Sequence, residues 1–214
     1  MVQSIRVFKK RLQISQKKWN TVQGQSLRTV NTILNTISRL NLIQRPNIFS
    51  DALLERFNDI PERLAYHLAD MINRSVADLF AYLAQFSDIV KEMQKIETQF
   101  RFDFSGMVKK QVVETETSTF HDLEMIEIAE RTIQEIIDRY ETELTLRKQI
   151  VNEIQEASSI QPQIITAYLV LWISEIYIEP REIYELFEEF THVEKLYERM
   201  LQSHDTFNAI PKSR

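Results

Sequence analysis

The stretch Ile72–Met93 reads INRSVADLFAYLAQFSDIVKEM and carries apolar residues at alternating steps of four and three. This seven-residue period places one apolar stripe along an α-helix, as in the helices of coiled coils. The stripe consists of Ile72, Val76, Leu79, Leu83, Phe86, Val90 and Met93. An isolated helix would expose this stripe to water, so we predict that at least one other helix covers it.

Two further long helices are predicted, one on each side of this stretch. The upstream helix has the same period over residues 19–40, with Gln23 and Ser26 as polar members of its stripe. It should end near residues 41–45, because a proline follows and disfavours helical geometry before it. The downstream helix should begin near residues 121–124. Its apolar face consists of Ile126, Ala129, Ile133, Ile137, Tyr140, Leu144, Val151 and Ile154.

Three shorter helices complete the prediction. Ser50 or Asp51 can cap the first, which runs through Phe57. The second follows Pro162 and the third is opened by Pro180, because proline fits the first turn of a helix. We therefore expect an all-α protein: an elongated helical bundle of three long coiled-coil-type helices with two shorter carboxy-terminal helices.

The expected domain order is linear. A basic amino-terminal arm covers residues 1–18, the long-helix bundle covers 19–157, a carboxy-terminal helical segment covers 158–203 and a tail covers 204–214. Within the bundle, residues from about 100–120 show no sustained helical period, and we expect them to form a long loop.

The sequence lacks the common motifs of catalysis and metal binding. Its 214 residues include only two glycines and no cysteine, which excludes disulfides, thiolate zinc sites and a thiol nucleophile. There is no His-Glu-x-x-His pair, no Gly-x-Ser-x-Gly elbow and no Gly-rich phosphate loop. We therefore expect no enzyme activity, no cofactor and no metal. The sequence contains no run of about eighteen apolar residues, so no membrane span is predicted. We expect a nuclear or cytoplasmic location.

Charge is distributed unevenly along the chain. The formal net charge is −5, yet residues 1–50 hold nine Lys or Arg and no Asp or Glu. The basic residues of the amino-terminal arm are Arg6, Lys9, Lys10, Arg11, Lys17 and Lys18. They can contact nucleic-acid phosphates, act as an import signal or pair with acidic helices, and pairing is favoured because the arm lacks interleaved aromatic residues.

The apolar stripes support two interpretations in about equal measure. The long helices can cover one another in a closed bundle, or one stripe can stay open for a helix of a partner protein. A protein that binds itself in this way would be a structural homo-oligomer. The candidate partner-binding residues are Val76, Leu79, Leu83, Phe86, Leu144, Tyr168, Trp172 and Tyr177.

Two segments of the carboxy-terminal third resemble a known family. Residues 140–151 read YETELTLRKQIV, and residues 166–172 read TAYLVLW, followed by Tyr177 and Glu179. A tyrosine-started acidic helix that turns basic, followed by a Tyr-Leu-x-x-Trp helix, is similar to the cyclin-dependent kinase 2-interacting protein family. The resemblance covers about 45 residues, and the amino-terminal basic helix with Trp19 adds weaker support.

This resemblance implies a non-catalytic adaptor. Members of that family pair with another coiled-coil protein and serve Afg2-type AAA+ ATPases, in assemblies linked to unfolding replisome proteins and to maturing the large ribosomal subunit. The family is also associated with cyclin-dependent kinase 2 and with checkpoint proteins. Direct nucleic-acid binding through the basic arm is the alternative that the resemblance does not favour.

Overall fold

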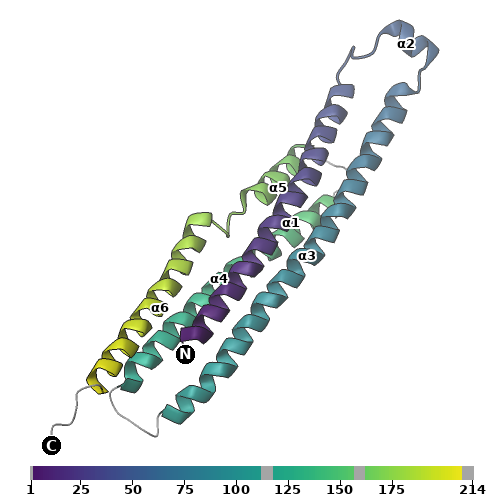
Figure 1. Ribbon diagram of the computed structural model, residues 1–214. Helices are drawn as coiled ribbons and strands as arrows, with labels where there is room; N and C mark the ends of the chain where they lie inside the picture. The colour runs from purple at the N-terminus through teal and green to yellow at the C-terminus, as the bar shows by residue number, and fades with distance from the viewer. Residues whose placement is uncertain (1, 112–117, 157–161, 209–214) are drawn as a thin grey trace, which may run out of the picture. The chain divides into compact units, whose positions relative to one another are not determined.

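The protein is built from long α-helices. The computed structural model describes the backbone of residues 2–111, 118–156 and 162–208, and the side chains of most of them. Within these residues the chain forms six helices and no strand, which confirms the predicted all-α class (Figure 1). The helices are α1 (Val2–Ile43), α2 (Asp51–Arg56), α3 (Ile60–Gln111), α4 (Ser118–Glu156), α5 (Pro162–Ser174) and α6 (Pro180–Asn208).

Several predicted helix ends are confirmed. The long helices α1, α3 and α4 have 42, 52 and 39 residues, and α5 and α6 are the two shorter carboxy-terminal helices. Ser50 precedes α2 with an extended backbone, as an N-cap residue does. Proline occupies the first turn of α3 and opens both α5 and α6. Local signals from proline and capping residues therefore predicted these ends well.

The first long helix begins well upstream of its predicted start at Trp19, so the predicted amino-terminal arm is helical. Residues 2–18 are the first part of α1, which does not begin at Trp19. The reason is that the heptad stripe extends upstream, and its members Ile5, Phe8, Leu12 and Ser15 are all buried.

The predicted loop at residues 100–120 is also wrong over most of its length. Helix α3 continues to Gln111 and α4 begins at Ser118, three residues before its predicted start. Buried Phe100 and Phe104 continue the apolar stripe of α3 through this region. Only residues 112–117 of the expected loop lie outside the described residues.

The expected carboxy-terminal tail is partly helical. Helix α6 extends to Asn208, five residues beyond the predicted end of the last helical segment at residue 203. The rest of the tail, and the predicted break at residues 157–159, lie outside the described residues.

The chain divides into two compact units. Unit 1 consists of Met1–Lys18, Ile89–Thr142 and Tyr177–Arg214, and unit 2 of Trp19–Asp88 and Glu143–Ile176. Helices α1, α3 and α4 each contribute residues to both units. These units group the residues differently from the predicted linear order of arm, bundle, carboxy-terminal segment and tail. That linear division into domains stays a prediction.

Unit 1 has an aromatic core. The ring of Phe8 in α1 meets that of Phe100 in α3 edge-on, with centroids 5.3 Å apart, and the centroids of Phe100 and Phe104 are 4.4 Å apart. Buried Ile133 of α4 and Phe190 of α6 belong to the same unit. The helices α1, α3, α4 and α6 thus all bury apolar side chains in unit 1.

In unit 2, α1 and α3 run antiparallel and are joined through α2 (Figure 1). The members of both predicted stripes that belong to unit 2 are buried along this pair, except for half-buried Leu40 at its end. Trp19 of α1 lies against Phe86 of α3, with ring centroids 4.3 Å apart, and Trp172 of α5 lies 6.2 Å from Phe86. The stripes predicted for this part of the chain therefore cover one another within it.

Candidate partner-binding surfaces

Most of the predicted partner-binding residues lie inside unit 2. Six of them are buried there: Val76, Leu79, Leu83, Phe86, Leu144 and Trp172. A partner could reach these side chains only if the unit opened. Tyr168 is half-buried and Tyr177 is exposed, so these two are the candidates that remain at the surface.

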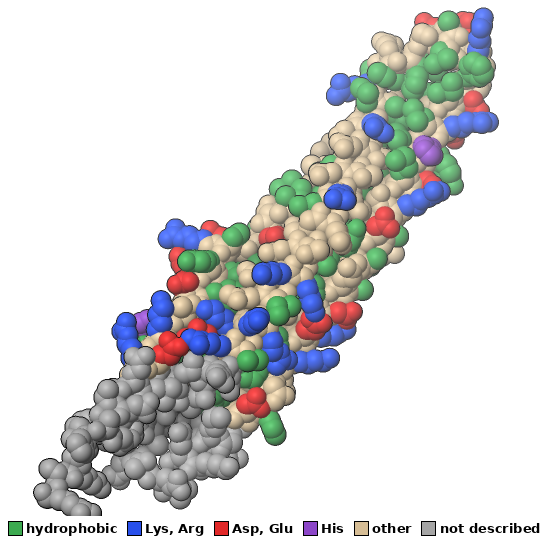
Figure 2. Space-filling model, in the orientation of Figure 1, with side chains coloured by type: hydrophobic (Ala, Val, Ile, Leu, Met, Phe, Trp, Pro, Cys, Tyr) green, Lys and Arg blue, Asp and Glu red, His purple; other side chains and the backbone are tan. Residues whose placement is uncertain are grey.

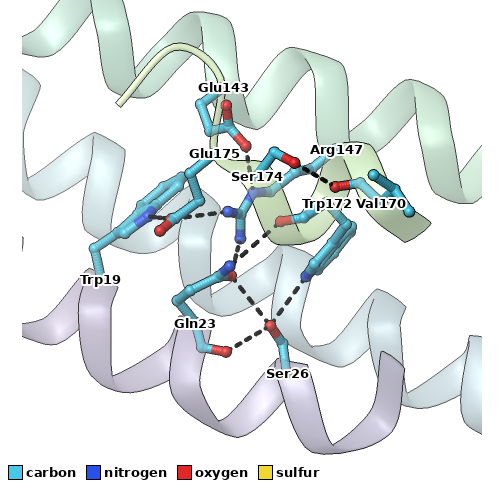
Figure 3. Close-up of polar contacts among 9 residues, drawn as sticks. All are labelled: Trp19, Gln23, Ser26, Glu143, Arg147, Val170, Trp172, Ser174 and Glu175. Carbon is cyan, nitrogen blue, oxygen red and sulfur yellow. Dashed lines mark hydrogen bonds and ion pairs between the residues drawn. The ribbon is translucent and has the colours of Figure 1, made fainter. Parts of the chain in front are cut away.

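A charged residue, Arg147, occupies the centre of unit 2 (Figure 3). Its side chain is fully buried and donates hydrogen bonds from all three guanidinium nitrogens. Nε donates to Oε1 of Glu143 at 3.0 Å, Nη1 to Oε1 of Gln23 at 2.7 Å and Nη2 to Oε1 of Glu175 at 2.9 Å. Two carboxylates and an amide, from α4, α1 and the residue directly after α5, therefore satisfy one buried cation.

Aromatic rings surround the same guanidinium. Its central carbon lies 4.4 Å from the ring centroid of Phe86, 4.9 Å from that of Trp172 and 5.0 Å from that of Trp19. A cation held over aromatic faces gains further attraction, most of all when water is excluded. The arginine thus packs as an aromatic-stacked core residue and as an ion-pair partner at once.

Both indole nitrogens join this network. Trp19 Nε1 donates to Oε1 of Glu175 at 2.8 Å, and Trp172 Nε1 donates to Oγ of Ser26 at 3.0 Å (Figure 3). Gln23 Nε2 donates to the backbone oxygen of Trp172 at 3.3 Å. The contacts link α1, α4 and the end of α5, so they fix the position of α5 in unit 2.

We name these residues the arginine cluster: Trp19, Gln23, Ser26, Phe86, Glu143, Arg147, Trp172 and Glu175. This cluster was not predicted from the sequence, although a signal was present. Arg147 lies three residues after Leu144 and four before Val151, which is a stripe position of α4. Gln23 and Ser26 are the polar members of the α1 stripe. Polar residues at such positions fix the register between helices, and here they meet one another.

The backbone at Glu175 has an unusual conformation. Glu175 directly follows α5 and has a φ of 45°, in the left-handed region that favours glycine or asparagine after a helix. A residue with a Cβ costs about 1 kcal/mol there. The carboxylate at this position binds both Trp19 and Arg147, and these bonds offset that cost.

Burial shifts the acid–base behaviour of this cluster. Burial lowers the pKa of Arg147, against the opposing effect of Glu143 and Glu175, but arginine keeps its proton at any working pH. Burial raises the pKa of Glu175 above its ordinary value, and the hydrogen bond from Trp19 and the charge of Arg147 oppose the shift. The folded protein therefore takes up a proton at Glu175 more readily than the unfolded chain does.

This shift predicts a pH dependence of stability. Because the pKa of Glu175 is raised in the folded state, protonation of its carboxyl group stabilises the folded protein below the ordinary carboxyl pKa. This contribution is lost as the pH rises through the pKa of the folded state. We expect the free energy of unfolding of the wild type, minus that of Glu175→Gln, to fall as the pH rises above the ordinary carboxyl pKa of about 4. Urea unfolding at several pH values measures it, with exposed Glu153→Gln as the control. A difference that rises with pH would show that the Arg147 ion pair outweighs burial.

Helix α5 presents a second feature, an apolar outer face. Ile165, Leu169 and Trp172 point into unit 2 and are buried. Further apolar side chains of the helix are exposed: Ile164, Val170 and Ile173 are 45%, 50% and 40% exposed. Val170 lies on the side turned away from the buried residues, and Ile164 and Ile173 lie at the two edges of that side, since nine residues turn an α-helix by about 180°. We name this side, from Ile164 through Val170 to Ile173, the outer face of α5.

The α2 end of the α1–α3 pair is a further exposed apolar surface of unit 2. No side chain between Ile37 and Leu68 is buried. Large apolar side chains are exposed here, and apolar side chains gather around α2 in Figure 2. They are Leu42, Ile48, Phe57 and Tyr66.

The predicted basic residues of α1 divide into two groups within unit 1. Nitrogens of Arg6 and Lys9 lie 3.9 Å from the Glu194 carboxylate of α6, and Arg6 also pairs with Glu198. These contacts confirm that part of the basic segment pairs with an acidic helix. The remaining residues, Lys10, Arg11, Lys17 and Lys18, are exposed on α1.

The described residues show neither of two other kinds of site. In this part of the chain, His, Asp and Glu side chains form no group of three that could hold a metal ion. Nor does any helix there combine the length and apolar character needed to cross a membrane.

Comparison with known proteins places the chain in a family. The family model of the C1orf109-like ribosome biogenesis protein matches residues 1–157, and no curated protein matches the chain significantly. The resemblance to the cyclin-dependent kinase 2-interacting protein family rests mainly on residues 140–179, and this assignment stays a prediction. Because the family model covers well over half of the 214 residues, the chain belongs to the C1orf109-like family of ribosome biogenesis proteins.

Proposed function

We propose that this protein is a non-catalytic adaptor subunit in ribosome biogenesis. In this proposal it pairs with a coiled-coil protein through the outer face of α5 and serves an Afg2-type AAA+ ATPase. Membership of a ribosome biogenesis family supports the process, and a nuclear or cytoplasmic location accords with it. Roles in replisome-protein unfolding, and association with cyclin-dependent kinase 2 or checkpoint proteins, rest on the sequence resemblance alone.

The observation that carries the adaptor proposal is the outer face of α5. The arginine cluster fixes this helix on one side, so the helix cannot turn to bury its other side. Ile164, Val170 and Ile173 then remain in water, although burying such a side chain contributes about 1.5–3 kcal/mol. A partner helix with its own apolar stripe would cover these residues.

Affinity purification of the tagged chain from its own cells, with mass spectrometry and sizing of the intact complex, tests the proposal. We expect a AAA+ ATPase and a small coiled-coil protein to be recovered with the wild type. Val170→Asp with Ile173→Asp should weaken recovery of the coiled-coil protein by about a hundredfold, because it buries two charges in an apolar interface.

A matched variant controls for added charge. Gln149 and Asn152 are exposed polar residues of α4 in the same unit, so Gln149→Asp with Asn152→Asp adds equal charge without removing apolar surface. This control should recover the complex as the wild type does. Recovery of the chain only with itself, or only with nucleic acid, would contradict the adaptor proposal.

A further inference from the structure

A groove of about 270 Å³ lies between α1 and α3 in unit 1. Three cations line it, Arg11 and Lys18 from α1 and Lys95 from α3. Ile14 and Ile96 supply apolar surface, and Glu92 is the single carboxylate among the lining residues. We name this feature the α1–α3 groove.

The groove keeps a positive charge after its internal pairing. Lys18 Nζ lies 2.6 Å from the Glu92 carboxylate, which offsets one of the three cations. Within the described residues, no carboxylate forms an ion pair with Arg11 or Lys95, and the Arg11 guanidinium lies over the ring of Phe8. Figure 2 shows Lys and Arg side chains over the amino-terminal part of α1 and the adjoining part of α3. The acidic residues of α6 pair instead with Arg6 and Lys9, which are not among the groove residues.

Apolar side chains are exposed along the same face of α1. Ile14 is 46% exposed, and Val7, seven residues earlier and therefore on the same face, is 53% exposed. Buried Ile96 lies beside Ile14 in the groove. Exposed apolar residues at heptad spacing beside Arg11 and Lys18 match a helix that has an apolar stripe bordered by carboxylates.

We propose that the α1–α3 groove docks an acidic amphipathic helix of a partner protein. The apolar stripe of that helix packs on Ile14 and Val7, and its flanking carboxylates pair with Arg11 and Lys95. The charge complementarity accelerates encounter and sets the register of the bound helix. This surface belongs to unit 1, so the proposal goes beyond the adaptor function and does not depend on the outer face of α5.

The composition of the groove favours a helix over RNA. Single-stranded RNA is held by aromatic side chains that stack on its bases, and no lining residue of the groove is aromatic. A phosphate backbone would use the cations but would leave Ile14 in contact with charged oxygens. An acidic helix uses both kinds of residue.

Fluorescence anisotropy with two probes tests this proposal on the full chain. The first probe is a fluorescein-labelled peptide of three heptads with Leu at positions a and d and Glu at e and g, and the second is a labelled single-stranded RNA of mixed sequence. We expect the peptide to bind at micromolar concentration. Ile14→Ser and Lys95→Glu should each weaken peptide binding about tenfold, since both residues are solvent-accessible in the free chain and the first provides apolar contact while the second would repel the peptide.

Three controls make the result specific. Lys148→Glu reverses an exposed charge of α4 in unit 2 and should leave peptide binding unchanged. A peptide with Lys in place of Glu at the e positions should bind the Lys95→Glu variant better than the original peptide does. Val170→Asp with Ile173→Asp should leave peptide binding unchanged, which separates this proposal from the adaptor proposal.

Two results would overturn the groove proposal. One is an acidic peptide that fails to bind the wild type, or that binds Ile14→Ser and Lys95→Glu as tightly as it binds the wild type. The other is binding of RNA in place of the peptide, with a steep salt dependence and no effect of Ile14→Ser, which would make the groove a phosphate-binding surface.

Discussion

Replacing Arg147 with methionine is expected to lower the free energy of unfolding of unit 2 by about 3–5 kcal/mol, because the change leaves a buried carboxylate without its cation. Glu143 is fully buried, and Arg147 Nε donates to its carboxylate. Methionine has a similar length and fills much of the same space, so the loss would come mainly from removing the buried cation and not from a cavity.

Tryptophan fluorescence provides a selective measurement of this effect. The chain has two tryptophans, Trp19 and Trp172, and both belong to the arginine cluster in unit 2. Urea unfolding followed by their fluorescence therefore reports on that unit. Exposed Lys148→Met removes a neighbouring charge outside the cluster and should change stability by no more than about 0.5 kcal/mol.

A double variant separates the ion pair from the rest of the cluster. With Glu143→Gln added to Arg147→Met, the buried carboxylate becomes a neutral amide, and most of the lost stability should return. If the double variant loses as much free energy of unfolding as the two single variants lose together, the loss arises from aromatic packing around the guanidinium. If Arg147→Met alone leaves stability unchanged, the arginine cluster is not a buried ion-pair network in solution.

The cluster also shows how far the sequence could predict this structure. The heptad stripes gave the positions of buried residues in α1, α3 and α4, because a helix with one apolar face has few ways to exclude that face from water. The same spacing placed Arg147 on a stripe, but a stripe position does not show which polar residues of other helices will meet it. The polar partners of Arg147 depend on the register between helices, and the periodicity of each helix does not determine that register.

The partner-contact residues stay a prediction that periodicity alone cannot decide. The strong stripe makes Val76, Leu79 and Leu83 candidates, but such a stripe is equally well covered by helices of the same chain, and here all three are buried. The outer face of α5 gives a weaker periodic signal because apolar residues surround that helix. Exposure, which only the folded structure reveals, distinguishes it from the core.

The loop predicted at residues 100–120 failed because composition was given more weight than period. The stretch contains a glycine and a run rich in Thr and Glu, which are common in loops. Yet Phe100 and Phe104 continue the stripe of α3 by steps of four, and packing in unit 1 overrides the weak local preference. The two phenylalanines therefore provide a direct test of this correction.

Phe100→Ala is expected to lower the stability of unit 1 by about 3–5 kcal/mol, because it removes a fully buried aromatic side chain from a packed core. The lost contacts include those of its ring with Phe8 and Phe104. Phe102 lies between the two buried phenylalanines in sequence but is 77% exposed, so Phe102→Ala should cost no more than about 0.5 kcal/mol. A loop would not produce this contrast, since its side chains do not follow a helical period.

Urea unfolding followed by far-ultraviolet circular dichroism measures both variants, because tryptophan fluorescence reports on unit 2 only. Equal losses for Phe100→Ala and Phe102→Ala would mean that this segment does not present one helical face to the core. A double-mutant cycle with Phe8→Ala tests the contact between the two rings. If Phe100→Ala lowers the free energy of unfolding only while Phe8 is present, the two rings stabilise the unit through their mutual contact. That coupling would directly connect the start of α1 with the part of α3 that was predicted as a loop, since the Phe8–Phe100 contact joins them.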